Sequence, residues 1–319
     1  MNRATILFLL KAAISGGLIT LLVYQVDVAA VGERLGQLTA GWVALALFML
    51  AALIGLAIIR WCIVLRVLSF DLPFMHVLKL VLIGQFFNQT LPSSLGGDAA
   101  RVFYAWRAGV PPGSALNSVA IDRLMGLFVL IFLTTAIIPI LDAKLGHDAL
   151  LIALTVFAAG GWLGIVVLYA FDNRLTRQFD RFRVIGFAVR LSRDTRLVSC
   201  RAGAFAGILS LSVLIHLFTV GLAWSLDHAL GADSGYSVYF LAMIPTLLAV
   251  SIPVSIAGWG VREQALVVIL GGLGVDAVHA LSISIMFGLL LIVGGLPGGL
   301  IWLTLRRQDA TAESASAAP

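Results

Sequence analysis

Apolar residues occur along the chain in stretches long enough to cross a lipid bilayer, and the short segments between them carry most of the charge. A transmembrane helix needs roughly 20 mostly apolar residues. The stretches that meet this requirement are about 4–26, 41–60, 119–140, 150–171, 203–225 and 280–304. The pattern predicts an all-α integral membrane protein, a polytopic helix bundle with a single transmembrane domain over residues 1–305 and a disordered cytoplasmic tail over 306–319.

Composition agrees with this class, and the distribution of charge predicts the orientation. Charged residues make up only 12% of the chain, against roughly 25% in a soluble domain. The connecting segments are mostly basic at 60–79, 99–123, 172–202 and after 304, and mostly acidic at 27–40, 141–149 and 226–237. Basic segments mark the cytoplasmic side. We therefore expect a multi-pass protein of the cytoplasmic (inner) membrane with both termini in the cytoplasm.

Two further apolar segments, 74–110 and 238–275, do not fit as ordinary spans. If 74–91 crossed the bilayer completely, Arg101 and Arg107 would lie on the side that the charge rule forbids. We therefore expect each segment to form a re-entrant helical hairpin, the first from the cytoplasmic side and the second from the outside. Irregular backbone at membrane depth is tolerated only inside protein or along a cavity, so each hairpin tip predicts an internal cavity.

The two hairpin tips resemble each other in sequence. Residues 91–97 read LPSSLGG and residues 252–258 read IPVSIAG, with 161 residues between matching positions and an arginine soon after each. The flanking spans recur with nearly the same spacing. The first half is expected to begin on the cytoplasmic side of the membrane, and the second half on the outer side. The pattern predicts an inverted repeat with halves at about 1–145 and 146–305, an architecture that many transporters use, with the site between the repeats.

The first tip contains the residues expected where a helix breaks inside the membrane. Pro92 disfavours helical geometry in the residue before it, and the adjacent glycines Gly96 and Gly97 allow close approach of the backbone. Asp98 or Ser94 can cap the helix that follows. A helix N-terminus at this depth offers unpaired amides and partial positive charge, which bind phosphate and other anions.

Arg101 and Arg262 follow the two tips, and with two helix ends they would suit a phospholipid head group. The alternative is local neutralisation, with Asp98 pairing to Arg101 at i and i+3 and Glu263 to Arg262. We favour the functional interpretation because ionisable residues at membrane depth are costly and usually functional. The predicted substrate-binding residues are Asn88, Ser93, Ser94, Gly96, Gly97, Asp98, Arg101, Asp122, Arg123, Gly258, Arg262 and Glu263.

Three other features have both a functional and a structural interpretation. Asp122 could face the cavity and hold Arg101 or a cationic head group, or be an ordinary acidic residue favoured near a helix N-terminus. His216 could relay protons, although a neutral histidine packed between helices is favoured. Residues 174–201 interleave arginines with apolar residues, which predicts an amphipathic helix on the inner leaflet and makes nucleic acid an unexpected partner.

Two remaining sequence features concern packing and catalysis. The glycines at 294, 295, 298 and 299 predict close packing of the last span against another helix. The sequence contains no phosphate-binding glycine-lysine loop, zinc-type cluster or nucleophile elbow. We therefore expect no cofactor, no metal and no enzymatic activity.

At these residues the sequence resembles the lysylphosphatidylglycerol synthase transmembrane-region family of flippase-like membrane proteins, over roughly 5–305. The resemblance rests on the pattern N-x-x-[LI]-P-x-x-x-GG-[ED]-x-x-R, here Asn88 to Arg101, on the pair Asp122-Arg123, and on G-x-R-E, which ends here at Glu263. Aspartate stands at 98 and 122 where the family often has glutamate, which keeps the charge and shortens its reach.

In fused members of this family the membrane part is associated with moving an aminoacylated phospholipid, and a separate cytosolic domain performs the aminoacyl transfer. The resemblance implies a stand-alone member without that domain, a lipid flippase or transporter whose partners are anionic or lipid-linked membrane lipids, a second copy of itself or a pathway enzyme. Two alternatives stay open. One is a membrane-embedded enzyme acting on lipid head groups, with Asp98, Asp122 and Glu263 as acid, base or metal ligands. The other is a non-transporting accessory subunit of a lipid or glycan pathway.

Overall fold

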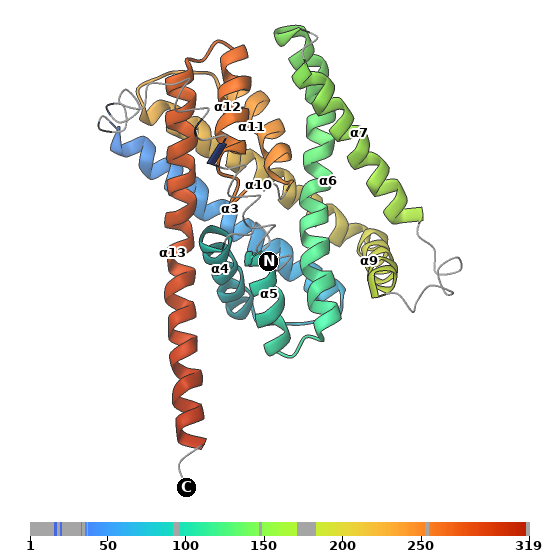
Figure 1. Ribbon diagram of the computed structural model, residues 1–319. Coiled ribbons are helices and arrows are strands. Elements are labelled where there is room, and N and C mark those ends of the chain that lie inside the picture. Colours follow the sequence, from blue (N-terminus) through green and yellow to red (C-terminus); the bar gives the residue numbers. More distant parts are fainter. Residues whose placement is uncertain are drawn as a thin grey trace.

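The computed structural model of the chain describes residues 38–91, 96–146, 149–170, 183–252 and 255–316, together with the single positions 16, 17, 20, 33 and 36. Within these residues every regular element is an α-helix (Figure 1). The helices are α3 (Ala40–Val67), α4 (Phe74–Thr90), α5 (Gly96–Arg107), α6 (Pro112–Leu145), α7 (Ala149–Ala170), α9 (Arg183–Cys200), α10 (Ala202–Ala229), α11 (Tyr236–Val250), α12 (Val261–Gly272) and α13 (Ala277–Ser316).

Five of these helices, α3, α6, α7, α10 and α13, are long and apolar enough to cross a membrane. They confirm the predicted all-α membrane fold and five of the predicted spans, while the first predicted span, 4–26, lies almost entirely outside the described residues. The helices extend beyond the predicted bounds. For example, α6 begins at Pro112, seven residues before the predicted start at 119, because backbone hydrogen bonding continues into interfacial residues that hydropathy excludes.

Two helical hairpins, α4–α5 and α11–α12, occupy the segments that did not fit as spans. Their helices contain 17, 12, 15 and 12 residues, fewer than the roughly 20 that a full crossing requires. In Figure 1 the first hairpin lies below and the second above the long helices α3 and α10, which run diagonally through the centre of the bundle. Residues 92–95 and 253–254, at the two tips, lie outside the described residues.

The order of helices in the first half recurs in the second half. The series α3, α4, α5, α6 corresponds to α10, α11, α12, α13, and α3 and α10 both contain 28 residues. Ala202 begins α10 162 residues after Ala40 begins α3, and Ala277 begins α13 165 residues after Pro112 begins α6. This agreement in order and spacing supports the predicted repeat.

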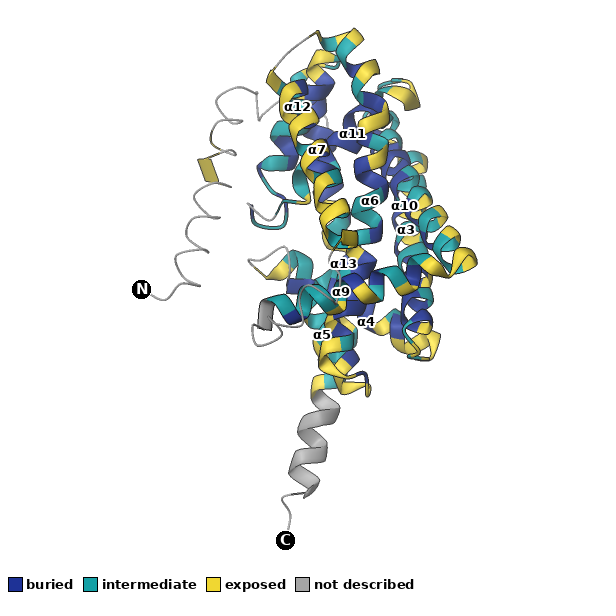
Figure 2. Ribbon diagram, turned by 90° about the vertical axis from the view of Figure 1, so that its right-hand side faces the viewer, coloured by how far each residue is buried: buried dark blue, intermediate teal, exposed yellow. Residues whose placement is uncertain are grey.

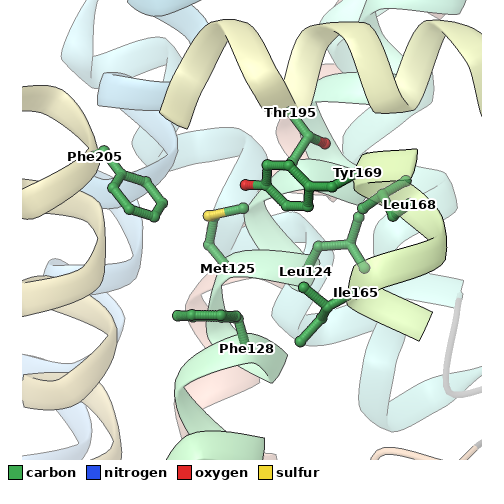
Figure 3. Close-up of a pocket in the computed structure, with 8 residues that line it drawn as sticks. All are labelled: Leu124, Met125, Phe128, Ile165, Leu168, Tyr169, Thr195 and Phe205. Carbon is green, nitrogen blue, oxygen red and sulfur yellow. The ribbon is translucent and has the colours of Figure 1, made fainter. Parts of the chain in front are cut away.

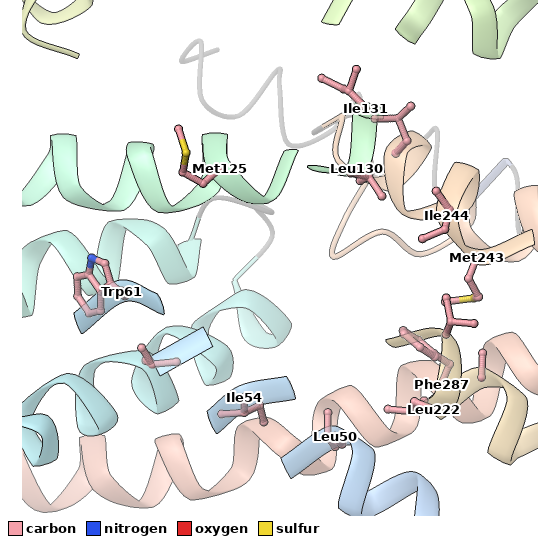
Figure 4. Packing of buried hydrophobic residues seen from close by; sticks show 14 of the residues in the cluster. Leu50, Ile54, Trp61, Met125, Leu130, Ile131, Leu222, Met243, Ile244 and Phe287 are labelled. Atoms are coloured by element: carbon pink, nitrogen blue, oxygen red, sulfur yellow. The ribbon is translucent and has the colours of Figure 1, made fainter. Parts of the chain in front are cut away.

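The core lies where the two series meet, and exposed residues cover the outward sides of α7 and α12 (Figure 2). Buried apolar side chains come from both halves. Figure 4 shows Trp61 and Met125 at one end of the core and Leu222, Met243 and Phe287 at the other. Since the surface of such a bundle faces acyl chains, its many exposed apolar residues are expected.

The predicted glycine packing of α13 is confirmed, and its partner is α4 in the other half. A Cβ atom added to Gly298 would lie 1.8 Å from the carbonyl oxygen of Leu82, and one added to Gly299 would lie 2.8 Å from the ring of Phe86. A side chain at Gly298 would therefore collide with backbone, which does not yield as a side chain does. The glycines thus bring α13 against the first hairpin.

Two predictions about terminal and surface segments differ from the structure or are only partly covered by it. The backbone of α13 is helical through Ser316, whereas a disordered tail was predicted from residue 306; its alanines and glutamate are strong helix formers, which continue a helix already nucleated in the bundle. The predicted amphipathic helix over 174–201 is present as α9, from residue 183 onward.

Candidate functional site

The carboxylate of Asp122 on α6 lies at the centre of a buried ionic cluster. Its Oδ1 accepts a hydrogen bond of 2.8 Å from Arg60 Nε, and its Oδ2 accepts one of 2.9 Å from Arg101 Nη2. All three residues are at most 7% exposed. One carboxylate therefore connects α3, α5 and α6 in the interior of a bundle whose surroundings are apolar.

Neighbouring side chains position the two arginines. Arg60 Nη1 donates a hydrogen bond of 3.0 Å to Ser212 Oγ, which adds α10 to the cluster. The guanidinium of Arg101 lies 4.1 Å from the centre of the Trp61 ring, within the range of a cation–π interaction. Trp61 Nε1 donates in turn to Ser118 Oγ at 3.3 Å, so the indole is held in place beneath the cation.

A second ion pair adjoins this cluster. Arg123 Nε donates to both carboxylate oxygens of Asp98, at 3.0 and 2.9 Å, and Arg101 Nη1 lies 3.6 Å from Asp98 Oδ1. Among the described residues, Arg60, Arg101 and Arg123 face two carboxylates, those of Asp98 and Asp122. The group therefore has one excess positive charge, and the Arg123 side chain is 53% exposed. Arg101 Nε is buried and has no hydrogen-bond partner among the described residues.

Glycines in the first hairpin allow Arg101 to take this position. A Cβ atom on Gly97 would lie 2.1 Å from the carbonyl oxygen of Gly84, and one on Gly84 would lie 2.8 Å from Cγ of Arg101. The helices α4 and α5 therefore approach with backbone directly against backbone, and the stem of Arg101 lies against α4. The amide of Gly97 donates to Asn88 Oδ1 at 3.0 Å, so Asn88 accepts a hydrogen bond from the first turn of α5. Of the two expected caps, Asp98 accepts hydrogen bonds from Arg123, and Ser94 lies outside the described residues.

The second hairpin contains a separate and more compact ionic group. Arg262 Nε and Nη2 donate to Glu263 Oε1 at 3.1 and 2.5 Å, and Ser284 Oγ on α13 donates to the same oxygen at 3.1 Å. Arg262 also lies over the ring of Trp259, 4.6 Å from its centre. The other oxygen, Glu263 Oε2, accepts a hydrogen bond of 2.6 Å from the amide of Gly260. The arginine and the start of α12 are thus both neutralised by one glutamate.

Left-handed backbone precedes α12. Ala257, Gly258 and Gly260 have φ values of 50°, 82° and 87°. A Cβ atom on Gly258 would lie 2.8 Å from Cγ1 of Val250 at the end of α11. Glycine is required at position 258 because a side chain there would be both strained and obstructed.

The predicted site residues therefore fall into two groups. Asn88, Gly97, Asp98, Arg101, Asp122 and Arg123 come together at the first hairpin, with Gly96 at the start of α5, and Gly258, Arg262 and Glu263 come together at the second. The hydrogen bonds of Arg101 go to Asp122 and those of Arg262 go to Glu263 and Ser284. Ser93 and Ser94 lie outside the described residues.

Two residues of the first cluster were not predicted. Arg60 was expected in a cytoplasmic connecting segment, which is wrong because α3 continues to Val67 and buries it. The available signal was a lone arginine with apolar residues on both sides, from 56 to 65. Ser212 gave no signal, since serines occur often in membrane helices. His216 is packed against α6, with its Nε2 3.1 Å from the carbonyl oxygen of Gly126.

The spanning helices and the ion pairs buried among them define a polytopic helical membrane protein with an ionic site in its interior. Residues 8–298 match the family described as the lysylphosphatidylglycerol synthase TM region, and the chain belongs to this family. The chain is also similar to the UPF0104 membrane protein MJ1595 of Methanocaldococcus jannaschii, with 31% identity over 81 residues. That match covers 25% of this chain and 24% of the relative's length.

Proposed function

We propose that the protein is a flippase or transporter that moves a phospholipid or lipid-linked molecule across the cytoplasmic membrane, with both termini in the cytoplasm. The observation that carries the proposal is the excess positive charge of the first cluster. Three guanidinium groups share two carboxylates, and Arg101 keeps a buried Nε without a partner among the described residues. A bound phosphate would balance this charge.

Arginine is well suited to this role. Its planar guanidinium binds phosphate through parallel hydrogen bonds and is desolvated at lower cost than an ammonium group. Ionisable residues inside a membrane protein are costly and usually functional. In the proposed mechanism the substrate phosphate reaches Arg101 beside the start of α5, while Asp122 and Trp61 keep the guanidinium in place.

The architecture and the family both support the proposal that this site binds a transported substrate. We propose that both hairpins are re-entrant and enter the membrane from opposite sides. This follows if the helix series of the two halves run in opposite directions across the membrane. In transporters built from such repeats, one repeat moves against the other around a central site. The family is named after the membrane region of a lipid synthase, and this name supports a lipid as the substrate.

The test is reconstitution of the purified protein in liposomes with head-group-labelled phosphatidylglycerol, phosphatidylethanolamine and a polyprenyl phosphate. We expect transbilayer movement of at least one of them, and a reduction of about thirtyfold in Arg101→Gln, because removing one member of a buried charge pair costs roughly that factor or more. Arg107→Gln is the matched control, since Arg107 is exposed at the end of the same helix. Absence of movement with every lipid, or an unchanged rate in Arg101→Gln, would contradict the proposal.

The same liposomes distinguish the other candidate functions. A head-group enzyme would use Asp98, Asp122 and Glu263 together, but Glu263 bonds to Arg262 and Ser284 while the aspartates bond to arginines of the first cluster. This arrangement favours the transporter over the enzyme. Mass spectrometry of the lipids after the assay would reveal a changed head group if the enzyme were correct. A stable co-purifying enzyme, without lipid movement, would indicate an accessory subunit.

A further inference from the structure

A partly open, apolar pocket lies between α6, α7, α9 and α10 (Figure 3). Its volume is about 240 Å³, and its apolar walls are formed by Leu124, Met125, Phe128, Ile165, Leu168 and Phe205. A water molecule occupies about 30 Å³ in the liquid. The pocket therefore has room for a length of hydrocarbon chain, and its apolar walls offer few partners to a polar head group.

The pocket is polar where α9 closes it. Thr195 lines it, is 1% exposed, and its Oγ1 has no hydrogen-bond partner within the described part of the chain. Beside it the hydroxyl of Tyr169 forms a short hydrogen bond with Ser199 Oγ, which joins α7 to α9. A buried hydroxyl without a partner costs free energy, and an ester carbonyl at the top of a lipid chain would supply the missing acceptor once the Thr195 side chain turns toward the pocket.

The charge of α9 specifies which lipid head group would accompany this chain. The helix carries four arginines and one aspartate. The aspartate, Asp194, accepts a hydrogen bond of 2.7 Å from Asn117 Nδ2 on α6 and one of 3.2 Å from Arg193 Nε. Arg190 and Arg193 are exposed. Basic residues on a surface helix attract anionic lipids, each strengthening binding by about fivefold.

We propose that this pocket binds one acyl chain of an anionic phospholipid, whose phosphate lies against the exposed Arg190 and Arg193 of α9. In this proposal the acyl chain extends past α7 as far as Met125, which is only 4% exposed. The site therefore differs from the ordinary lipid contacts of an outer helix surface. Met125 lies one turn after Asp122 on α6. The bound lipid therefore adjoins the ionic cluster, but its binding does not depend on whether the protein transports lipid.

The experiment uses the full chain in nanodiscs of phosphatidylcholine containing a small fraction of phosphatidylglycerol with a photoactivatable acyl chain. Cross-linked peptides are identified by mass spectrometry. We expect cross-links to residues 124–128 and 165–169, and competition by unlabelled phosphatidylglycerol about fivefold stronger than by phosphatidylcholine. Ile165→Trp fills the pocket and should lower cross-linking to 124–128 by about tenfold, since one methylene contact in an apolar pocket already changes affinity by that factor.

The matched control is Val166→Trp, which places the same ring on the adjacent, 61% exposed position of α7 and should leave the cross-links unchanged. A second variant, Arg190→Gln with Arg193→Gln, changes only exposed residues and should abolish the preference for phosphatidylglycerol while the chain still binds. Equal labelling by phosphatidylcholine and phosphatidylglycerol probes, or labelling that survives Ile165→Trp, would overturn the proposal in favour of ordinary surface lipid. Cross-links to α7 without cross-links to residues 124–128 would also overturn the proposal, because they would show that protein fills the pocket.

Discussion

The two hairpins place an arginine in the same environment but neutralise it in different ways. Arg101 lies 4.1 Å from the ring of Trp61, and Arg262 lies 4.6 Å from the ring of Trp259. The carboxylate that meets Arg262 belongs to the next residue in the chain. The carboxylate that meets Arg101 belongs to Asp122 on another helix, which must also neutralise a second arginine.

This difference determines what each group can do. The second group is neutral, and its glutamate also satisfies an amide at the start of α12, so it has no remaining charge for a ligand. The first group has an excess positive charge and joins four helices. We therefore propose that substrate binds at the first hairpin, and that the second hairpin mainly holds α12 against α13.

The largest expected effect comes from removing the shared carboxylate. Asp122→Asn leaves the buried Arg60 without a carboxylate and leaves Arg101 with only its 3.6 Å contact to Asp98, and it should lower the free energy of unfolding by about 4 kcal/mol. Denaturation by SDS in mixed micelles would measure it. The control is Asp71→Asn, because Asp71 is exposed and its 3.5 Å contact with Arg66 lies at the surface; such pairs contribute about 0–1 kcal/mol. Equal losses in the two variants would show that Asp122 is not central to the cluster.

A paired replacement distinguishes the two hairpins more sharply. Replacing a complete buried ion pair with uncharged residues is often nearly neutral. Arg262→Met with Glu263→Gln should therefore stay within about 1 kcal/mol of the wild type, because glutamine still accepts from the Gly260 amide. Arg101→Met with Asp122→Asn leaves Arg60 alone and should cost about 3 kcal/mol. The same unfolding measurement applies, and similar losses in both doubles would mean that the two groups are equivalent.

The close approach of α4 and α5 is the next contrast to test. Gly97→Ala places a methyl group against the carbonyl oxygen of Gly84 and should destabilise the protein by about 2 kcal/mol. Gly113→Ala, in the first turn of α6, meets no atom within 4 Å and should be neutral or stabilising by up to about 1 kcal/mol. If Gly97→Ala unfolds at the same SDS concentration as Gly113→Ala, the backbones of α4 and α5 are not in direct contact at Gly97.

The smallest expected effect concerns the aromatic ring under Arg101. Trp61→Phe keeps a ring but weakens the cation–π interaction and removes the hydrogen bond to Ser118, for a loss of about 1 kcal/mol. The rate of lipid movement should fall severalfold, since the guanidinium is held less firmly. Trp302→Phe is the comparison, because Arg306 lies 5.6 Å from that ring near the end of the bundle. A greater loss in Trp302→Phe would contradict the role given to Trp61.

Much of the fold could be predicted because its causes are local in the sequence. Five spans follow from runs of apolar residues, since lipid forces each backbone to satisfy its own hydrogen bonds as a helix. The hairpins follow from segments that the charge rule does not allow to cross, and α4 occurs at the predicted residues, Phe74–Thr90. The role of Gly298 also follows from its spacing in the last span.

The partners of the charged side chains could not be predicted. Arg60 and Asp122 are 62 residues apart in the chain, and their contact depends on how α3 and α6 are rotated about their axes. Hydropathy does not specify that rotation in a helix that is apolar on all sides. The sequence analysis therefore left the partner of Asp122 open and placed Arg60 in a connecting segment.

The sequence by itself determined the class of protein, the order of the five described spans, and the pair of arginines that follow the hairpin tips, because these depend on the composition of contiguous segments. The tertiary structure alone decided that Arg262 is neutralised by its neighbour while Arg101 shares a carboxylate with Arg60. The physical reason is that a buried charge is balanced by whichever group packing brings within about 3 Å, and packing joins residues far apart in the chain.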